Sequence, residues 1–456
     1  MGLTSDLGAL LSEGDPHLTA SGQQQTKLIL LDTLGAMLAA SRPALPGSQV
    51  LKRFIEAQGG AGASPVVGYE EWTDGVTAAL VNGYLAYAMD IESHHGPSVV
   101  HAAAAVVPAV IAISPMTSTT GAQMIDAVAL GVEMACRTSL AIGPNDLYAR
   151  GFHPTAIGGC FGAAVAVARL LHLDAEATTR TLGLAATQAA GLLTWTQEPS
   201  EQSRPFTAGL AARNGFTAGL LAASGLGASV DTFDVNSRYN AFTAWSLNGT
   251  GNLETLEGDI LGCRSIEELT IKRYACCAFL HPGIDALLTI MSDHGLTSAD
   301  VHAIELRFPA TGAPVIDGNI LRSHRAQYIL PLATVMGAVD FDDVIFDKGE
   351  VPEVERLARR TNVVHDAQLD ITFPQHYASE VTVITRRGAS WSESRRDARG
   401  TPALPLAPSE IVEKYHALAA LRVPELRHQA IAEEVLSLDE SADVRRLVSL
   451  LHFPRP

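Results

Sequence analysis

Apolar residues recur at helical spacing through roughly the first 260 positions of the chain. The segments that show this pattern cover residues 23–41, 73–90, 119–143, 174–193 and 208–227. Apolar side chains three and four positions apart line one face of a helix, so each segment is predicted to be helical. Ala and Gly are abundant in these segments, which lets helix axes approach toward the short end of the ~8–10 Å range. This part of the chain is therefore expected to be all-helical.

The pattern changes near residue 270. Polar and apolar residues alternate at 300–308 and 379–388, which predicts strands, and residues 367–373 form a third candidate strand. Helical patterns at 286–295 and 353–361 lie between them. We therefore expect an α+β segment here.

A Pro-rich linker, "GTPALPLAPSE", follows, and helical patterns return at 409–423 and 440–451. The prediction is a mainly α protein in which residues 1–268 and 403–456 form one discontinuous all-helical domain. Residues 269–402 are expected to form a smaller α+β lid domain inserted into it.

Composition narrows the classes of function. The chain has 456 residues and a formal net charge of −17. That charge disfavours nucleic acids and anionic membranes as partners. A small anionic substrate stays compatible with it, because salt screens distant charges beyond ~8–10 Å. The start of the chain lacks the basic and apolar runs of a signal peptide, and no window reaches the ~18 apolar residues of a membrane span. Five cysteines without paired spacing indicate a reducing, cytoplasm-like compartment.

A polar loop, "IESHHGPSVVH", joins two of the predicted helices. With the preceding Asp90 it carries Glu92, His94, His95 and His101. Loops at such junctions commonly carry function, but solvated loop residues explain the pattern equally well. A metal site is the weakest interpretation, since the histidines do not have the i, i+4 spacing of a helical ligand pair. No nucleotide or metal motif occurs elsewhere in the sequence.

Further candidates precede helix starts or the domain change. His153 comes directly before Pro154 in a polar turn that also contains Tyr148. This places an imidazole at a helix N-terminus, where free N–H groups attract carboxylates. Arg204 also precedes a helix and could clamp an anion through its guanidinium, and Lys272 lies where the pattern changes. A histidine that bonds only local backbone, and cations that are merely exposed, are the alternatives.

Several segments in this order resemble the MmgE/PrpD family. They are "LDTLG", "MDIES…HAAAAVVPA", "GFHPTAIGGCFGAAVAVARLLHLD", "GLAATQAAGL", "RPFTAGLAARNG", "KRYACCAFLHPGIDA", "SEVTVITRRG" and "GTPALPLAPSEIVEKY". The resemblance implies a large helical domain, a smaller α+β lid domain, a homodimer, an active site between the domains and no cofactor. Members include 2-methylcitrate dehydratase, cis-aconitate decarboxylase and iminodisuccinate epimerase.

The resemblance also implies roles for particular residues. Asp90 and Glu92 match the acids of the family's "DFDD" loop. His101 and His153 match two family histidines, and Lys272 matches the lysine at the domain junction.

The sequence departs from the family pattern at four positions. Arg204 and Thr207 stand where the family's "KPLH" motif has lysine and histidine. Leu332 replaces a common tyrosine, and Cys277 replaces a histidine of the decarboxylases.

These observations predict a cofactor-independent lyase that acts on a small di- or tricarboxylate by dehydration or decarboxylation. His101 and His153 are the expected acid and base, with Asp90 and Lys272 as further catalytic groups. Substrate contacts are expected from Arg204, Tyr148, His94 and Cys277. An epimerase of a dicarboxylate and a non-catalytic binder of small anions stay open as alternatives.

Overall fold

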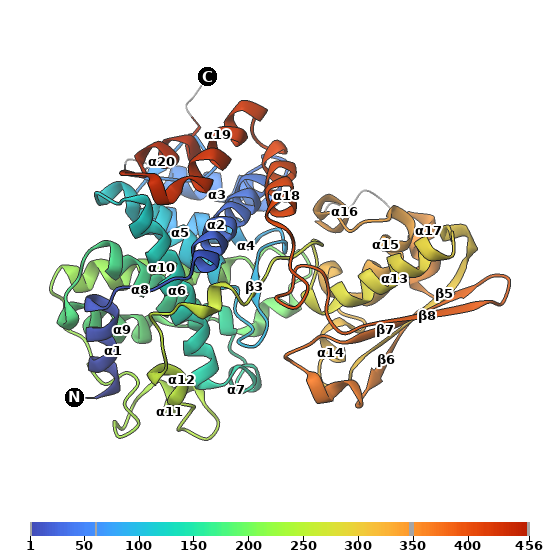
Figure 1. Ribbon diagram of the computed structural model, residues 1–456, viewed down its shortest axis with the longest axis horizontal. Coiled ribbons are helices and arrows are strands. Elements are labelled where there is room, and N and C mark those ends of the chain that lie inside the picture. The colour runs from blue at the N-terminus through green and yellow to red at the C-terminus, as the bar shows by residue number, and fades with distance from the viewer. Residues whose placement is uncertain (1, 60–61, 346–350, 454–456) are drawn as a thin grey trace. The chain divides into compact units, whose positions relative to one another are not determined.

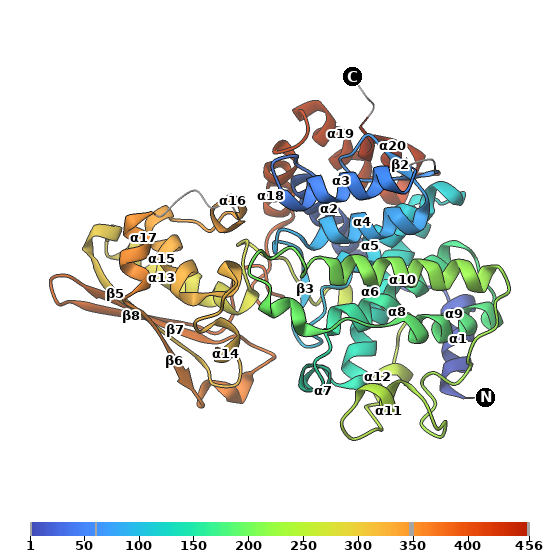
Figure 2. The ribbon, with the colours of Figure 1, turned by 180° about the vertical axis from the view of Figure 1, so that it is seen from behind.

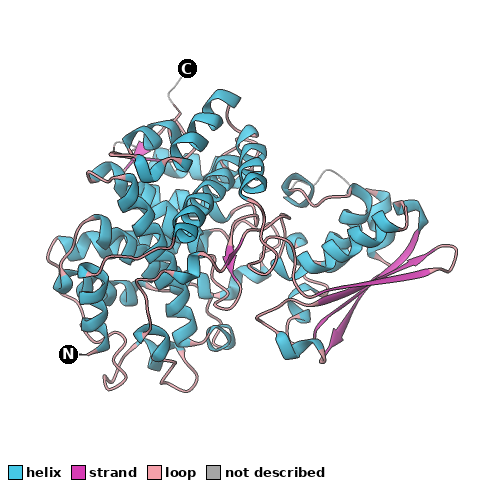
Figure 3. Cartoon of the chain, viewed as in Figure 1, coloured by secondary structure: helices cyan, strands magenta, loops and turns pink. Residues whose placement is uncertain are grey.

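The computed structural model describes residues 2–59, 62–345 and 351–453. Internal contacts divide the chain into two compact units. The helical unit comprises Met1–Trp195, Gln202–Leu269 and Ala407–Pro456, and the mixed unit comprises Thr196–Glu201 and Thr270–Leu406. Helices dominate and strands are few (Figure 3), which confirms the predicted mainly α class.

The helical unit is built from helices that enclose an Ala- and Leu-rich core. Its helices are α1 (Leu3–Glu13), α2 (Ala20–Ala40), α3 (Pro46–Ala57), α4 (Gly75–Tyr87), α5 (Ala102–Ile113), α6 (Gly121–Ile142), α7 (Pro144–Ala149), α8 (Pro154–Leu170), α9 (Ala175–Gln188), α10 (Phe206–Ala223), α11 (Ala241–Trp245), α12 (Glu254–Glu257), α18 (Pro408–Ala420), α19 (Glu425–Leu436) and α20 (Arg445–Leu451). Three two-residue strands, β1 (Ser64–Pro65), β2 (Trp72–Thr73) and β3 (His94–His95), lie in its connections, and β4 (Leu269–Thr270) lies at its boundary.

Helix α8 is buried along its length and packs against α6 and against α10, beside which it lies in Figure 2. Helix α8 needs small residues because the neighbouring helices approach its backbone closely. A Cβ on Gly162 would lie 2.4 Å from the carbonyl oxygen of Gly131 on α6. A Cβ on Gly215 of α10 would lie 2.5 Å from the carbonyl oxygen of Cys160 on α8. The plain composition of α8 is therefore a packing requirement, and it fixes the position of the residues at its start.

The C-terminal segment packs on the N-terminal one. Helices α18 and α19 lie against α2 (Figure 1). The ammonium group of Lys27 on α2 is 2.7 Å from the Asp439 carboxylate. Residues more than 400 positions apart thus share one core, with the mixed unit inserted between them in sequence.

The mixed unit contains a four-stranded sheet with the order β6-β5-β7-β8. Its elements are β5 (Val301–Pro309), β6 (Thr361–Asp366), β7 (Ser379–Thr385), β8 (Ser390–Arg395), α13 (His281–Asp293), α14 (Ala313–Ile316), α15 (Ala326–Met336), α16 (Phe341–Ile345) and α17 (Pro352–Ala358). Strands β5 and β6 are parallel, whereas β7 is antiparallel to both β5 and β8. Helices α13 and α15 pack against the sheet (Figure 1), and alternate residues of β7 are buried beneath them.

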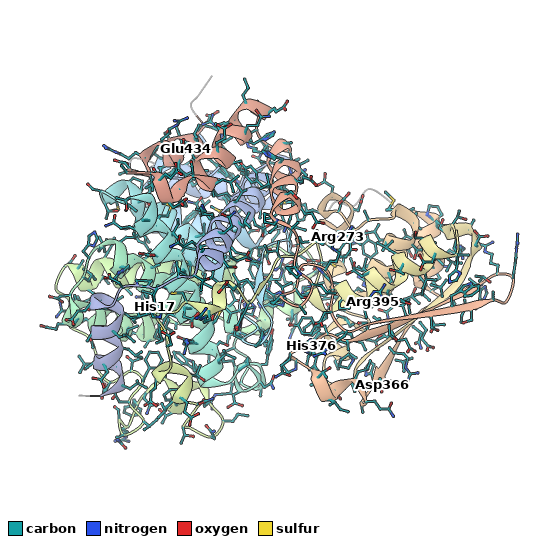
Figure 4. The ribbon with its side chains drawn as sticks, viewed as in Figure 1. His17, Arg273, Asp366, His376, Arg395 and Glu434 are labelled. Atoms are coloured by element: carbon teal, nitrogen blue, oxygen red, sulfur yellow. The ribbon has the colours of Figure 1, made fainter. Side chains whose placement is uncertain are left out.

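The predicted strands at 300–308 and 379–388 are confirmed, but the candidate strand at 367–373 is wrong. Residues Leu369–Thr372 form a 3₁₀ turn. Carboxylates hold this turn: Asp366 accepts a hydrogen bond from the Gln368 amide, and Asp370 accepts one from the Thr311 amide. Two strands of the sheet were missed: β6, which ends at Asp366, labelled in Figure 4, and β8.

No helix within the described residues is long and apolar enough to cross a membrane.

Candidate active site

The polar loop between α4 and α5 is held by a lysine on α18, which also pairs with an aspartate on α2. The ammonium group of Lys414 on α18 donates to the carbonyl oxygen of Ile91 at 2.8 Å. The same nitrogen lies 2.6 Å from a carboxylate oxygen of Asp32 on α2, which is fully buried. Asp90 adopts a left-handed backbone conformation with φ of 51°, which turns the chain sharply after α4. The loop acids Asp90 and Glu92 are both buried instead of solvated.

Arg204 is almost completely buried beside this loop. Its guanidinium donates to the Asp90 carboxylate at 3.4 Å and to the carbonyl oxygen of Tyr87 at 3.1 Å. It also lies over the Tyr87 ring, with Cζ 4.3 Å from the ring centroid. A buried guanidinium requires such compensation, since removing a charge from water is costly. Arg204 therefore joins the segment before α10 to the end of α4.

His101 lies at the end of the loop, immediately before α5. Its Nδ1 is 2.8 Å from an oxygen of the Glu92 carboxylate, which is fully buried. Its backbone N–H donates to the hydroxyl of Thr155, in the first turn of α8. A carboxylate beside an imidazole favours the protonated ring.

His153 precedes α8 as its N-cap residue, with Pro154 in the first helical position. Its side chain makes no cap hydrogen bond. Instead, Nδ1 lies 3.1 Å from the hydroxyl of Thr207 on α10, and Nε2 lies 3.5 Å from the Tyr87 hydroxyl. The ring packs edge-on against Trp195, at 5.3 Å between centroids. The side chain is thus turned toward α4 and α10.

Five rings form a continuous cluster, which we call the imidazole–tyrosine cluster. In order, neighbouring centroids are separated by 5.5, 4.6, 6.0 and 5.3 Å, along His94, His101, Tyr87, His153 and Trp195. Tyr87 is the centre of the cluster because it contacts both His101 and His153. The cluster places three imidazoles and a phenol together, with the Arg204 guanidinium over the phenol ring, a set that can move protons and bind an anion.

The Tyr87 phenol stays protonated at neutral pH. Burial raises its pKa well above the ordinary value, although the nearby Arg204 guanidinium acts in the opposite direction. Tyr87 is therefore a hydrogen-bond donor in this cluster.

His95 belongs to a separate pair. Its Nε2 lies 3.0 Å from the Glu268 carboxylate, and its Nδ1 lies 2.8 Å from the Ser98 hydroxyl. Burial opposes charge on the ring, but the sulfur of Cys136 and the Glu268 carboxylate outweigh burial and raise the pKa of His95 to about 10. Within the described residues, no group of three His, Cys, Asp or Glu side chains could hold a metal ion.

Comparison with known proteins decides the family. Residues 16–250 match the MmgE/PrpD N-terminal domain, and residues 274–440 match the MmgE/PrpD C-terminal domain. The chain belongs to the MmgE/PrpD family.

Curated relatives extend over nearly the whole length of both chains. Cis-aconitate decarboxylase of Aspergillus terreus is 27% identical across 94% of this chain and 92% of its own. A cis-aconitate decarboxylase-like protein of Aspergillus oryzae is 27% identical across 98% of this chain and 97% of its own. Human cis-aconitate decarboxylase is 24% identical across 96% of this chain and 92% of its own. This MmgE/PrpD membership, with these relatives, supports an enzyme of the lyase type.

Only some of the predicted MmgE/PrpD site residues lie together. Asp90, His94, His101, His153 and Arg204 lie within one network of contacts in the helical unit.

The other three predicted residues lie on other elements of the chain. Tyr148 is 40% exposed on α7. Lys272 and Cys277 are buried in the mixed unit, where the Cys277 amide donates to the carbonyl oxygen of Ser323.

Sequence reasoning missed Tyr87, the ring between the two imidazoles. Its signal was weak but present: a tyrosine at the end of a predicted helix, three positions before the acidic loop. Trp195 and Thr155 were also missed, and no local pattern marks either of them.

Proposed function

We propose that this protein is a cofactor-independent decarboxylase of a small unsaturated tricarboxylate of the cis-aconitate type. The observation that carries the proposal is the placement of His101 and His153 on either side of Tyr87, each imidazole with its own hydrogen-bonding or charged partner. Family membership and the names of the curated relatives support the substrate class.

The proposed chemistry needs a proton donor but no oxidant. The bond between the leaving carboxylate and its carbon breaks, and CO₂ departs. The electron pair left behind is delocalised over the adjacent C=C bond and carboxylate until a proton is added to carbon. Charge that develops in this way is stabilised by fixed cations and donors, which is often the largest catalytic contribution.

We assign the proton delivery to His101, because the Glu92 carboxylate at 2.8 Å favours its protonated form. The buried Tyr87 hydroxyl and His153 supply further donor and acceptor atoms beside it. Asp90 holds Arg204 in place through their ion pair. Arg204, His94, Tyr148 and Cys277 are the proposed substrate-binding side chains, and Lys272 is a further proposed catalytic group.

Dehydration and epimerisation are distinguished by what leaves the substrate. The test incubates purified protein with cis-aconitate in D₂O and follows the products by ¹H and ¹³C NMR. The proposal expects release of one CO₂ for each substrate consumed and one deuterium bound to carbon in the product. Addition of water to the double bond without release of CO₂ would instead support a hydratase, the reverse of the dehydratase reaction.

A dicarboxylate assay tests the epimerase alternative. Deuterium uptake with inverted configuration, without a new alkene or CO₂, would replace the proposal with an epimerase. If neither cis-aconitate nor the dicarboxylate is turned over but citrate-like acids bind, the protein is a binder of small anions. A control with both histidines changed, His101→Gln and His153→Gln, checks that turnover comes from the cluster.

Two expectations from the sequence accompany this proposal. The first is a homodimer, which sedimentation equilibrium of the full chain would test. The second is a cytoplasmic location, which fractionation of the source cells would test.

A further inference from the structure

Thr207 contacts His153 and the backbone of the preceding turn at the same time. It lies in the first turn of α10 and is buried. Its hydroxyl oxygen is 2.8 Å from the carbonyl oxygen of Arg204 and 3.1 Å from Nδ1 of His153. Both separations are those of good hydrogen bonds.

Counting protons leaves one arrangement that satisfies both contacts. A carbonyl oxygen can only accept, so the single hydroxyl proton of Thr207 must point to Arg204. The hydroxyl oxygen then accepts from the ring, which requires a hydrogen on Nδ1 of His153. In the reverse arrangement two oxygen lone pairs would face each other at 2.8 Å, and the contact with Arg204 would be lost as a hydrogen bond.

The other ring nitrogen agrees with this assignment. Nε2 of His153 lies 3.5 Å from the Tyr87 hydroxyl, a long contact in which the phenol can donate to an unprotonated Nε2. Tyr87 stays protonated because it is buried. The Thr207 contact therefore requires hydrogen on Nδ1, and the Tyr87 contact is compatible with a lone pair on Nε2.

We propose that Thr207 is a positioning residue that fixes the tautomer of His153, so that Nε2 of this ring acts as a hydrogen-bond acceptor in the site, toward the Tyr87 hydroxyl. The proposal deepens the decarboxylase function proposed above. The catalytic importance of Thr207 rests on that function, whereas the tautomer of His153 does not. It also gives the two imidazoles different tasks. His101 faces a carboxylate, which favours the charged ring, whereas His153 faces a neutral hydroxyl, which does not.

The direct test is ¹⁵N NMR of the full-length protein labelled at histidine, with the His153 signals assigned from their loss in His153→Gln. In the wild type, Nδ1 of the neutral ring should give a protonated-nitrogen shift and Nε2 an unprotonated one. Thr207→Val keeps the shape of the side chain and removes the acceptor, so the signals should move toward a mixture of both tautomers. Thr207→Ser should restore the wild-type pattern.

A matched control lies on the same helix. The Thr217 hydroxyl also donates to a backbone carbonyl, that of Arg213 at 2.7 Å, but it lies outside the cluster. Thr217→Val should leave the His153 signals and the turnover number unchanged. Thr207→Val should lower the turnover number by roughly 10-fold or more, in keeping with the ~10²–10⁴-fold effect of losing a proton-transfer group outright.

The outcomes separate the two proposals. A neutral His153 with hydrogen on Nε2 in the wild type, or an unchanged tautomer in Thr207→Val, would overturn the role of Thr207. Lack of turnover of cis-aconitate by the wild type would overturn the proposed function, while the NMR result would still decide the tautomer.

Discussion

Replacing Glu92 by glutamine removes one charge from the cluster and almost nothing from its shape. The Glu92 side chain is fully buried, and its oxygen lies 2.8 Å from Nδ1 of His101. A hydrogen bond to a charged group is worth about 1.5–3 kcal/mol. If protonated His101 delivers the proton, losing that stabilisation lowers the turnover number by roughly 10- to 150-fold, at ~1.4 kcal/mol for each factor of ten.

Stability should change much less than activity. Glutamine keeps an oxygen that can accept from the ring, and it removes a buried charge that is costly to desolvate. We therefore expect the melting temperature of Glu92→Gln to stay within about 2–4 °C of the wild type, which corresponds to about 1 kcal/mol. The assay is the rate of CO₂ release from cis-aconitate, measured beside the thermal unfolding of the same sample.

Glu268→Gln is the matched control. Glu268 also pairs with a histidine of the polar loop, but that histidine, His95, lies outside the imidazole–tyrosine cluster. The control should retain the wild-type rate. An unchanged rate in Glu92→Gln, or equal losses of rate in both variants, would refute the role given to the Glu92 charge.

Three further predictions concern stability. Gly215→Ala should destabilise the fold by about 1–3 kcal/mol in urea, because its Cβ would overlap the α8 backbone. Lys414→Met removes the cation beside the fully buried Asp32 carboxylate and should cost about 3–5 kcal/mol by the same measure. The pKa of His95 is raised to about 10, so its stabilisation should be complete below pH ~6.5 and lost as pH rises toward 10. Urea unfolding between pH 6 and 10 should show this loss in the wild type and less of it in Glu268→Gln.

Each of these changes has a control. A Cβ on Gly227 would meet open space, so Gly227→Ala should be close to neutral. Lys52 is 42% exposed and lies 3.9 Å from Glu71, so Lys52→Met should cost less than about 1 kcal/mol. Equal effects of Lys414→Met and Lys52→Met would show that the buried pair adds nothing. A wild-type stability independent of pH over this range would rule out a charged His95.

The sequence predicts those helices and strands whose apolar residues recur at a regular spacing. Helical periodicity indicated the main helices, and Pro154 correctly marked the start of α8 and the N-cap position of His153. Strands β5 and β7 alternate clearly and were found. Strand β6 is short and only partly buried, and its "TNVVHD" sequence has little alternation, so it was missed.

Site geometry depends on contacts that no local pattern encodes. Glu92 and His101 are nine positions apart, and their pairing requires the loop to turn at Asp90 and to be held by a lysine from α18. Tyr87 ends a helix that otherwise looks like any buried helix, so only its neighbours in space reveal its place between two imidazoles.

The tie between Lys414 and Ile91 spans 323 positions of the chain. During synthesis the loop with Asp90 and Glu92 leaves the ribosome long before its anchor exists. A chain released before α18 would have the cluster residues but would lack the lysine that fixes their loop. Formation of the candidate site is thus coupled to synthesis of α18, and chains that stop before this helix are expected to be inert.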